Sequence, residues 1–500
     1  MRDSSACGLD GLSIKIVKLC FDAIGPVLQH IVNNCLINND FPLAWKHSLI
    51  RPIFKSGDPT MPSNYRPISL VPVIAKITER IVQRQLHHYL STNCLLSDSQ
   101  HGFRPNHSTT SALIGISDSI LTAIDNTEIS LLCLIDLSKC FDVISHSKLL
   151  DKLQILGIDS GWFRSYLEGH TQSVCISNNK GYRVMSKPLP NNVGVFQGSA
   201  LGPLLFTVFA NDLCLHAPDA CIVQYADDTQ VLVSGRKSAL DTTIARLEVA
   251  LEALSDWFAA NGLKVNADKT QLMAFGSRQN LRGLPDISVQ FRQAVLKPCQ
   301  NVKNLGVTFD PCLTWDDHVT TLTRKCFGIL IGLSHARHHL PADTIVTIVN
   351  ALVLSHIRYC LPVYGNCTKK NLDKIQKVIN FAARVISGRR KYDHVADVRD
   401  ALGWLSAADL SSQDTLVFLH KVVVTEEPAA IARSFNRNDE MRERTTRQDS
   451  NMWLPSVRTE AGKRRFCYRA ALQYNRLPSQ LKTMTTSQFK SSLKRYLLER

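Results

Sequence analysis

Aspartates stand directly after two apolar runs and could bind divalent metal together. Asp136 follows the run SLLCLI, and Asp227 and Asp228 follow the run CIVQYA. A charged side chain at the end of a buried strand is costly unless it is paired or bound to a cation. Three carboxylates converging from neighbouring strands could bind Mg²⁺ through hard oxygen ligands, and two such ions support in-line phosphoryl transfer. An Asp-Asp pair alone is also common in a plain turn.

Short strands must position these acids. The apolar runs at 130–137, 221–225 and 230–233 are typical of buried strands, and residues 226–229 have the length and residue types of a hairpin turn. Apolar residues at helical spacing predict helices over the ranges 13–37, 70–90, 244–258, 371–386 and 489–498. In the helix over 371–386 the Lys and Arg residues lie largely off the apolar stripe. This pattern fits a surface helix with a core face, or a groove that follows a nucleic-acid backbone.

Length and composition indicate a globular protein of several domains. The chain has 500 residues, of which 44% are hydrophobic, which excludes wholesale disorder and suggests about three domains. The longest apolar stretch, 344–357, is too short for a membrane span, and the first residues lack a secretory signal. The 15 Cys residues form no C-x-x-C pair, which argues against structural zinc. We therefore expect a nuclear or cytoplasmic protein that is not secreted and has no membrane partner.

Positive charge is concentrated near the C-terminus. The net charge is +15, and residues 461–500 contain ten Lys or Arg and one Glu. Such a density suits a polyphosphate partner such as nucleic acid, although a solvated basic surface would give the same count. The polar, charge-mixed stretch at 436–450 predicts a mobile linker before this region.

Seven segments in the same order resemble the motifs of reverse transcriptases from non-LTR retrotransposons of the LINE type, in particular jockey-like elements. The resemblance covers about residues 8–400, and 475–478 with 489–490 resembles the tails of these elements. The matching segments are 65–70 and 100–105 (finger motifs), 136–146 (motif A), 194–206 (motif B), Tyr225-Ala-Asp-Asp228 (motif C), 266–275 (motif D) and 305–318 (motif E and its flank).

The resemblance implies an α+β fold of the right-hand polymerase type. Its fingers would span 1–125, and its palm, an antiparallel sheet plus helices carrying motifs A to E, would span 126–318. A helical thumb would span 319–400, and a basic helical C-terminal region would fill 401–500. Residues 8–11 (GLDG) resemble the family shortly after Met1, so we expect the chain to lack the N-terminal endonuclease that elements of this class commonly carry.

The resemblance assigns the catalytic roles. Asp136, Asp227 and Asp228 would be the ligands of two Mg²⁺ ions, with Mn²⁺ as an alternative metal. Lys269 would be a general acid toward the departing pyrophosphate, and a solvated lysine is the competing interpretation. Phe141 would be a steric gate that leaves no room for a ribose 2′-hydroxyl, and core packing is its alternative.

The remaining assignments concern the nucleotide. Gln197 and Gly198 would lie near the nascent base pair, where Gly permits close backbone approach, and Tyr225 belongs to the same nucleotide-binding set. Arg66 is a candidate for the triphosphate, because Arg suits bidentate phosphate contact, but a structural ion pair is equally compatible. Lys55 is a weaker candidate of the same kind.

The implied activity is RNA-directed DNA polymerisation, in which a primer 3′-hydroxyl is extended with dNTPs. The implied partners are an RNA template, a DNA primer or target DNA, and an endonuclease supplied in trans. Two alternatives stay open: an inactive remnant that only binds RNA, and an RNA-copying polymerase that uses ribonucleotides. The sequence does not specify the host, the template and target specificity, the expression or the oligomeric state.

Two positions depart from the family pattern. Phe196 stands where motif B usually has Pro, and His170 stands where the family often has Arg. We expect neither change to remove metal binding, but the phenyl ring could alter the stiffness of the motif B loop.

Overall fold

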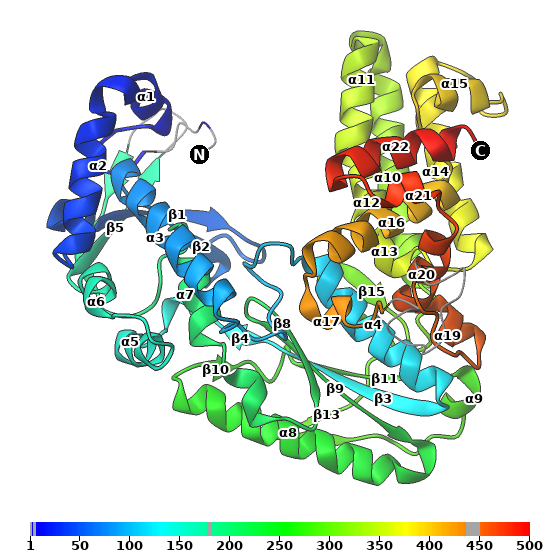
Figure 1. Ribbon diagram of the computed structural model, residues 1–500, viewed down its shortest axis with the longest axis horizontal. Helices are drawn as coiled ribbons and strands as arrows, with labels where there is room; N and C mark the ends of the chain where they lie inside the picture. The colour runs from blue at the N-terminus through cyan, green and yellow to red at the C-terminus, as the bar shows by residue number, and fades with distance from the viewer. Residues whose placement is uncertain (1–2, 4–6, 178–182, 437–450) are drawn as a thin grey trace. The chain divides into compact units, whose positions relative to one another are not determined.

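The computed structural model describes residue 3 and residues 7–177, 183–436 and 451–500, and the chain forms two compact units (Figure 1). Unit 1 consists of Met1–Phe103, Asp136–Ala217 and Ala253–Asn266, and unit 2 consists of Arg104–Ile135, Pro218–Glu252 and Ala267–Arg500. The linker predicted at 436–450 lies, apart from Asn436, outside the described residues.

Unit 1 contains a sheet with the strand order β2-β1-β5-β6, to which β7 adds by pairing with β5. Strand β1 runs antiparallel to β2 and parallel to β5, and a separate antiparallel pair joins β4 to β10. The strands are β1 (His47–Phe54), β2 (Tyr65–Leu70), β4 (Leu137–Ser138), β5 (His170–Ser177), β6 (Arg183–Met185), β7 (Leu189–Asn191) and β10 (Lys264–Val265).

The helices of unit 1 precede, separate and follow these strands along the chain. They include α1 (Ile14–Leu19), α2 (Phe21–Ile37), α3 (Val73–Thr92), α5 (His146–Ile155), α6 (Gly161–Leu167) and α7 (Gly202–Phe209), with short 3₁₀ turns η1 (Leu43–Trp45), η2 (Pro62–Asn64), η3 (Cys140–Asp142) and η4 (Leu213–His216). The helix predicted over 13–37 is two helices, because the backbone leaves helical geometry at Cys20, whose ψ is 4°. Apolar spacing continues across this break and therefore could not reveal it.

Unit 2 contains an antiparallel sheet with the order β11-β3-β9-β8. Its strands are β3 (Glu128–Ile135), β8 (Cys221–Tyr225), β9 (Asp228–Arg236) and β11 (Gln271–Phe275). Helix α4 (Thr109–Asp125) contacts β3, β8 and β9, so it covers one face of this sheet. The helix begins at a capping box in which Ser108 and Ser111 bond each other's backbone N–H.

The rest of unit 2 is mostly helical. Two hairpins pair β12 (Val289–Phe291) with β13 (Ala294–Leu296), and β14 (Val302–Asn304) with β15 (Val307–Phe309). Its helices include α9 (Arg278–Leu281), α10 (Asp316–Ala336), α11 (Ala342–Val349), α12 (Ser355–Arg358), α13 (Leu361–Tyr364), α14 (Lys369–Ser387), α15 (Ala396–Ala401), α16 (Ala407–Thr425), α17 (Ala429–Ala432), α19 (Glu460–Arg464), α20 (Phe466–Asn475), α21 (Ser479–Lys482) and α22 (Thr486–Leu498). The long helix α8 (Leu240–Ala260) contains residues of both units.

Several local predictions are confirmed. The predicted helices over 244–258, 371–386 and 489–498 fall within α8, α14 and α22, and the strand predicted at 221–225 is β8. The antiparallel sheet with helices confirms the α+β class. Helix α14 ends at Gly388, whose φ of 73° is the left-handed conformation that closes many helices. Within the described residues, no helix is both long and apolar enough to cross a membrane.

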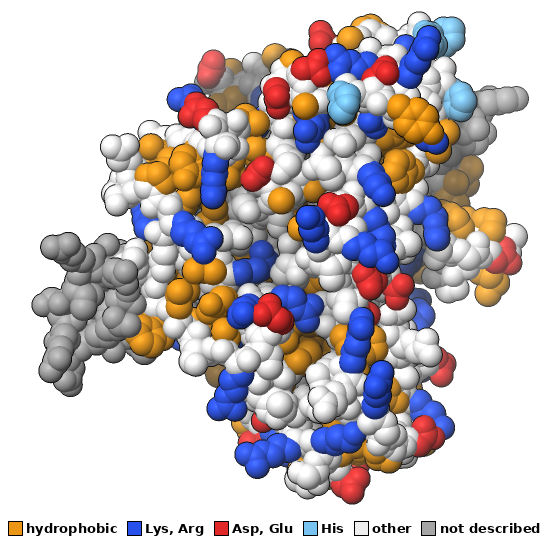
Figure 2. All heavy atoms as spheres, turned by 90° about the vertical axis from the view of Figure 1, so that its right-hand side faces the viewer, with side chains coloured by type: hydrophobic (Ala, Val, Ile, Leu, Met, Phe, Trp, Pro, Cys, Tyr) orange, Lys and Arg blue, Asp and Glu red, His pale blue; other side chains and the backbone are white. Residues whose placement is uncertain are grey.

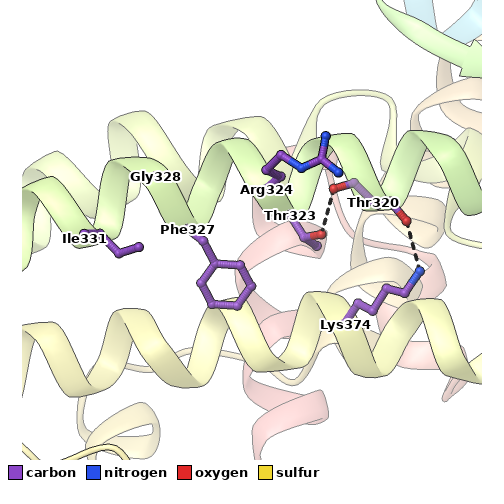
Figure 3. A pocket seen from close by; sticks show the side chains of 7 residues that line it. All are labelled: Thr320, Thr323, Arg324, Phe327, Gly328, Ile331 and Lys374. Atoms are coloured by element: carbon purple, nitrogen blue, oxygen red, sulfur yellow. Dashed lines mark hydrogen bonds between the residues drawn. The ribbon is translucent and has the colours of Figure 1, made fainter.

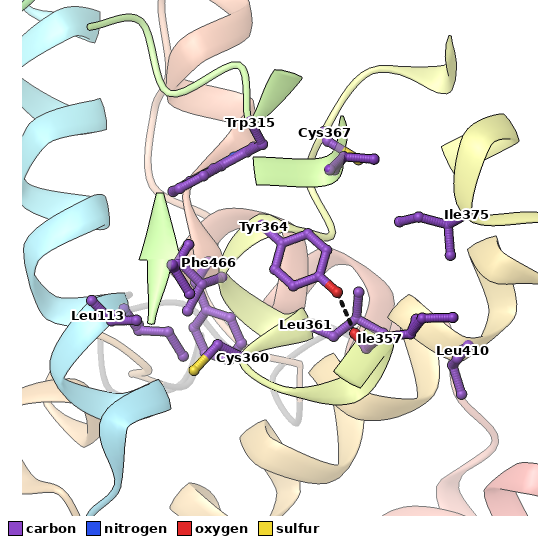
Figure 4. Close-up of a cluster of buried hydrophobic side chains, with 14 of the residues drawn as sticks. Leu113, Trp315, Ile357, Cys360, Leu361, Tyr364, Cys367, Ile375, Leu410 and Phe466 are labelled. Carbon is purple, nitrogen blue, oxygen red and sulfur yellow. Dashed lines mark hydrogen bonds between the residues drawn. The ribbon is translucent and has the colours of Figure 1, made fainter. Parts of the chain in front are cut away.

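The main core of unit 2 joins parts of the chain that are far apart in sequence (Figure 4). Trp315 is fully buried, and its indole N–H donates to Asn366 Oδ1 at 2.6 Å. The Tyr364 hydroxyl donates to the carbonyl of Ile357 within the same cluster. Because Leu113 of α4 and Phe466 of α20 belong to it as well, the C-terminal helices are an integral part of this core.

Candidate active site

The acids of motif C lie at one end of the unit 2 sheet. Strands β8 and β9 pair through Tyr225 and Asp228, which leaves Ala226 and Asp227 as a two-residue connection. Ala226 has a φ of 56°, the left-handed value that a two-residue hairpin requires at its first position. The turn predicted over 226–229 is therefore shorter, because Asp228 already belongs to β9. Asp227 sits at the tip and Asp228 opens the next strand.

Asp136 directly follows the last residue of β3, a strand that ends at the same end of this sheet. Strand β3 pairs with β9 in a register that ends at Ile135 and Thr229, and Asp136 is the next residue. It belongs to unit 1, where its carbonyl accepts a hydrogen bond from the Asn266 N–H at 2.8 Å. Two of the predicted metal ligands thus lie in unit 2 and one in unit 1. Across the described part of the chain, no three His, Cys, Asp or Glu side chains are arranged as a metal site.

Lys269 lies just before β11, which begins at the same end of the unit 2 sheet. It is exposed and stands two residues before Gln271, which pairs with Leu134 of β3. The topology therefore brings Lys269 and the motif C hairpin to one sheet end.

Phe141 packs within unit 1. Its half-buried ring stacks on Phe206, with the ring centroids 4.5 Å apart, and meets the edge of Phe103 at 6.1 Å. The packing interpretation of Phe141 therefore has a geometric basis, and the gate assignment stays a prediction.

The backbones of motifs A and B are held against each other in unit 1. The N–H of Val195 donates to the Phe141 carbonyl, and the N–H of Gly194 donates to the Ile144 carbonyl, both at 2.8 Å. A Cβ at Gly194 would lie 2.7 Å from backbone atoms of Asp142. This close approach requires glycine at position 194.

Gln197 and Gly198 lie beside β2 in unit 1. Gln197 Nε2 donates to Asp142 Oδ1 at 2.8 Å, and its carbonyl accepts from the Ser69 N–H at 2.7 Å. Burial raises the pKa of Asp142, and the hydrogen bond from Gln197 opposes that rise. Gly198 has a φ of 122°, and a Cβ there would lie 2.6 Å from the Ser69 carbonyl oxygen. The close approach that Gly198 permits is thus to strand β2.

The predicted triphosphate cations lie on the β1–β2 hairpin. Arg66 is exposed in β2 opposite Ile53, and the exposed Lys55 donates its backbone N–H to Asn64 at 2.8 Å. Among the residues that the structure describes, Arg66 forms no ion pair. The role of Arg66 at the triphosphate stays a prediction.

The two departures from the family pattern contact each other. The ring of Phe196 lies 4.5 Å from that of His170, and both side chains are buried. The His170 Nε2–H donates to the Tyr166 carbonyl at 2.6 Å. Burial lowers the pKa of His170 to about 4, so the ring is neutral near pH 7. A neutral ring against a phenyl ring avoids the cost of burying an unpaired charge.

This burial predicts an acid-sensitive contribution to stability. Below pH 6.5 the unfolded chain protonates His170 while the folded chain does not, so stability falls from about pH 6.5 down to 4. Between pH 7 and pH 5 we expect the wild type to lose about 2 kcal/mol more than a His170→Gln variant. Urea denaturation at both pH values measures this difference. The exposed His88→Gln is the control, and equal losses in the wild type and His170→Gln would contradict the assignment.

A surface hollow of about 610 Å³ lies between α10 and α14 of unit 2 (Figure 3). Residues of α10 from Thr320 to Ile331 line one side, and Lys374 of α14 lines the other. Lys374 Nζ donates to Thr320 Oγ1 at 3.0 Å, beside the guanidinium-bearing Arg324. Two cations thus line this hollow, and the groove that follows a nucleic-acid backbone stays a prediction.

Sequence reasoning missed one buried acid of unit 1, Glu79 of α3. It stands four residues after Ala75 and three before Val82, on the buried face of the helix. An acid on an apolar stripe is the signal that could have found it.

A family comparison identifies this arrangement. Residues 53–309 match the model of the family described as reverse transcriptase (RNA-dependent DNA polymerase). This match covers more than half of the chain and includes motifs A to D as well as the 305–309 segment of motif E. The chain therefore belongs to the reverse transcriptase family.

Individual relatives agree with the family. The chain is 32% identical over 406 residues to the RNA-directed DNA polymerase from mobile element jockey of Drosophila melanogaster, covering 79% of this chain and 43% of the relative. It is 31% identical over 378 residues to a probable RNA-directed DNA polymerase from transposon BS of the same species, covering 72% and 40%. The chain thus spans less than half of these relatives. A solved apo telomerase from Candida tropicalis aligns with a TM-score of 0.36 and 14% identity, covering 53% of this chain and 54% of that one.

Proposed function

We propose that this chain is an RNA-directed DNA polymerase that extends a primer 3′-hydroxyl with dNTPs on an RNA template. The observation that carries the proposal is the motif C hairpin, which holds Asp227 and Asp228 at the sheet end where β3 leads into Asp136. Family membership and the jockey relatives support the same reaction.

The donor set fits divalent magnesium. All three predicted ligands are aspartates, and carboxylate oxygens are the hard ligands that Mg²⁺ prefers. Ile135 pairs with Thr229, and Asp136 and Asp228 are the sequence neighbours of these two paired residues. Asp136, Asp227 and Asp228 would hold two Mg²⁺ ions, or Mn²⁺ in their place. The ions would supply charge stabilisation for the attacking and leaving oxygens.

The other predicted residues would bind and orient the nucleotide. Gln197 and Gly198 would face the nascent base pair, with Gln197 oriented by Asp142. Arg66 would hold the triphosphate, and Tyr225 would contact the nucleotide beside the hairpin. Lys269 would donate a proton to the departing pyrophosphate.

The larger assignments follow the family. We propose fingers over 1–125, a palm over 126–318, a thumb over 319–400 and a basic C-terminal region over 401–500. The hollow at Arg324 and Lys374 would follow the backbone of the template–primer duplex. The partners would be an RNA template, a DNA primer or target DNA, and an endonuclease acting in trans, in the nucleus or the cytoplasm.

A primer-extension assay on the purified chain tests this function. We expect incorporation of dTTP on a poly(rA)–oligo(dT) duplex with Mg²⁺, and loss of incorporation with EDTA. RNA binding without any incorporation would instead support the inactive remnant. Extension with UTP in place of dTTP would support the RNA-copying polymerase.

The gate assignment of Phe141 makes a separate prediction. Phe141→Ala opens space beneath the sugar, so we expect the preference for dTTP over UTP to fall about tenfold or more. The ratio of kcat/KM for the two nucleotides measures it. Phe206→Leu is the matched control, because it removes the stacking partner while Phe141 is kept. An unchanged preference in Phe141→Ala would leave core packing as its role.

A further inference from the structure

Glu79 is buried in unit 1 and reaches from α3 to the segment before α7. Only 1% of its surface is exposed. Its Oε2 accepts a hydrogen bond from the Ala200 N–H at 2.6 Å, and the Leu201 N–H bonds the same carboxylate. The Tyr166 hydroxyl donates to Oε1 at 3.1 Å. One carboxylate therefore joins α3, α6 and the motif B segment.

The start of helix α7 is a favourable place for this charge. The first N–H groups of a helix lack partners within the helix and carry partial positive charge, which stabilises a nearby anion. Ser199 Oγ accepts from the Gly202 N–H at 2.8 Å at the same helix start. Glu79 and Ser199 together satisfy the backbone donors between Ala200 and Gly202.

The carboxylate stays expensive to bury despite these bonds. Desolvation raises its pKa to about 7, and the hydrogen bonds from Ala200, Tyr166 and Leu201 and the charge of Lys76 oppose that rise. A leucine at this position would avoid the desolvation cost. The desolvation cost is offset in part by the hydrogen bonds with which the side chain holds the loop before α7.

That loop, residues 196–201, carries the predicted nucleotide contacts. Gln197 and Gly198 occupy it, and its position is further fixed by the Ser69 N–H bonding the Gln197 carbonyl. Tyr166 also bonds the His170 ring through its carbonyl, and that ring packs on Phe196. The loop is thus held at Phe196 by the aromatic rings, at Gln197 by β2 and at Ala200 by Glu79.

We propose that Glu79 is a positioning residue that fixes the 196–201 loop through the Ala200 and Leu201 N–H groups and so sets the affinity for the incoming nucleotide. The proposal has an anchoring half, which concerns the loop, and a nucleotide half, which concerns the affinity. The nucleotide half rests on the proposed polymerase function. The geometry gives Glu79 no contact with a reacting atom, so its effect passes through Gln197 and Gly198.

Steady-state extension kinetics on the full chain test the nucleotide half. Loss of a charge-assisted hydrogen bond corresponds to about a tenfold change, so we expect Glu79→Ala to raise the KM for dTTP about tenfold while kcat changes less. Glu79→Gln keeps an acceptor and should recover most of the KM. Tyr166→Phe, which removes one hydroxyl from the carboxylate, should fall between the wild type and Glu79→Ala.

Asp125→Asn is the matched control. Asp125 is a buried carboxylate of unit 2 that accepts from the Thr459 N–H at 2.7 Å, just before α19. Like Glu79, it accepts backbone N–H groups just before a helix, but it belongs to unit 2 and the motif B loop belongs to unit 1. We expect Asp125→Asn to lower the melting temperature while the KM for dTTP stays unchanged.

Amide hydrogen exchange tests the anchoring half without requiring activity. Exchange over 196–201 should accelerate in Glu79→Ala and stay at the wild-type rate in Asp125→Asn. Unchanged exchange in Glu79→Ala would overturn the inference. Faster exchange with an unchanged KM would overturn its nucleotide half while the polymerase function stands. A wild-type chain without incorporation would overturn the proposed function and that half with it, whereas exchange still decides the anchoring.

Discussion

Asp227→Asn is expected to reduce dTTP incorporation about 10³-fold or more. The substitution keeps the size of the side chain but removes the charge that binds a divalent cation. Charge stabilisation by such an ion is worth several kcal/mol, and each 1.36 kcal/mol corresponds to a factor of ten in rate. Because Asp227 lies at the tip of the β8–β9 hairpin, the ladder from Tyr225 and Asp228 onward is left intact.

The variant needs a control for the charge change alone. Asp219 is an exposed acid just before β8, so Asp219→Asn changes the net charge equally near the other end of the same strand. We expect it to retain wild-type incorporation. RNA binding should persist in both variants, because neither removes a Lys or Arg side chain. More than a tenth of wild-type activity in Asp227→Asn would rule this residue out as a metal ligand.

The sequence predicts the local part of this site well. Strand β8 is a five-residue apolar run next to turn residues, and its acids follow at fixed spacing, so its bounds and the place of Asp227 are readable directly. The same holds for α14, whose apolar period is regular over its whole length. Where a pattern is local and repeated, neighbouring residues carry the information.

The long-range part could not be read in this way. The hydrogen bonds that hold the Glu79 carboxylate come from Ala200 and Tyr166, which are 121 and 87 residues away in the chain. The ring of Phe141 stacks on that of Phe206. The residues around Phe141 in the sequence do not indicate that its ring has this distant partner. Side-chain roles that depend on a distant segment become visible only when the fold brings that segment close.

The basic C-terminal region shows the limit of charge counting. Lys and Arg side chains are spread over the face shown in Figure 2, among acids and apolar side chains. Two arginines near residue 465 form hydrogen bonds inside unit 2: Arg464 donates to the Leu313 carbonyl at 2.7 Å, and Arg469 donates to Thr415 Oγ1 at 2.9 Å. Burial lowers the pKa of Arg469 to about 10. These two cations stabilise the fold, so the count of ten overstates what a nucleic acid could meet.

Two acids of α4 hold this region in unit 2. Asp118 accepts from the N–H groups of Phe466 at 2.6 Å and Cys467 at 2.9 Å, where α20 begins. Asp125 lies seven residues, or about two turns, further along α4 and accepts from the N–H groups before α19. A Cβ at Gly462 would lie 2.6 Å from the Asp125 carboxyl group, so a larger residue there would have to displace this carboxylate from its hydrogen bonds.

Asp118→Ala is therefore expected to destabilise unit 2 by about 3–5 kcal/mol, which is the range for breaking a buried charged pair or network. The change leaves two backbone N–H groups without an acceptor at a helix start, and it removes an acid whose charge favours the buried Arg469. Chemical denaturation, with far-UV circular dichroism to follow the helices, measures the loss. The C-terminal helices should also show faster amide exchange, because their attachment to α4 depends on these bonds.

Two further variants separate the loss of the hydrogen bonds that attach α20 to α4 from the effect of removing any carboxylate. Asp118→Asn keeps one acceptor oxygen, so it should cost less than Asp118→Ala. Asp373→Ala removes an exposed acid of α14 and should stay within about 0.5 kcal/mol of the wild type. If Asp118→Ala lost under about 1 kcal/mol, the hydrogen bonds to Phe466 and Cys467 would be incidental. The core contacts of Phe466 with α4 would then suffice to hold the region.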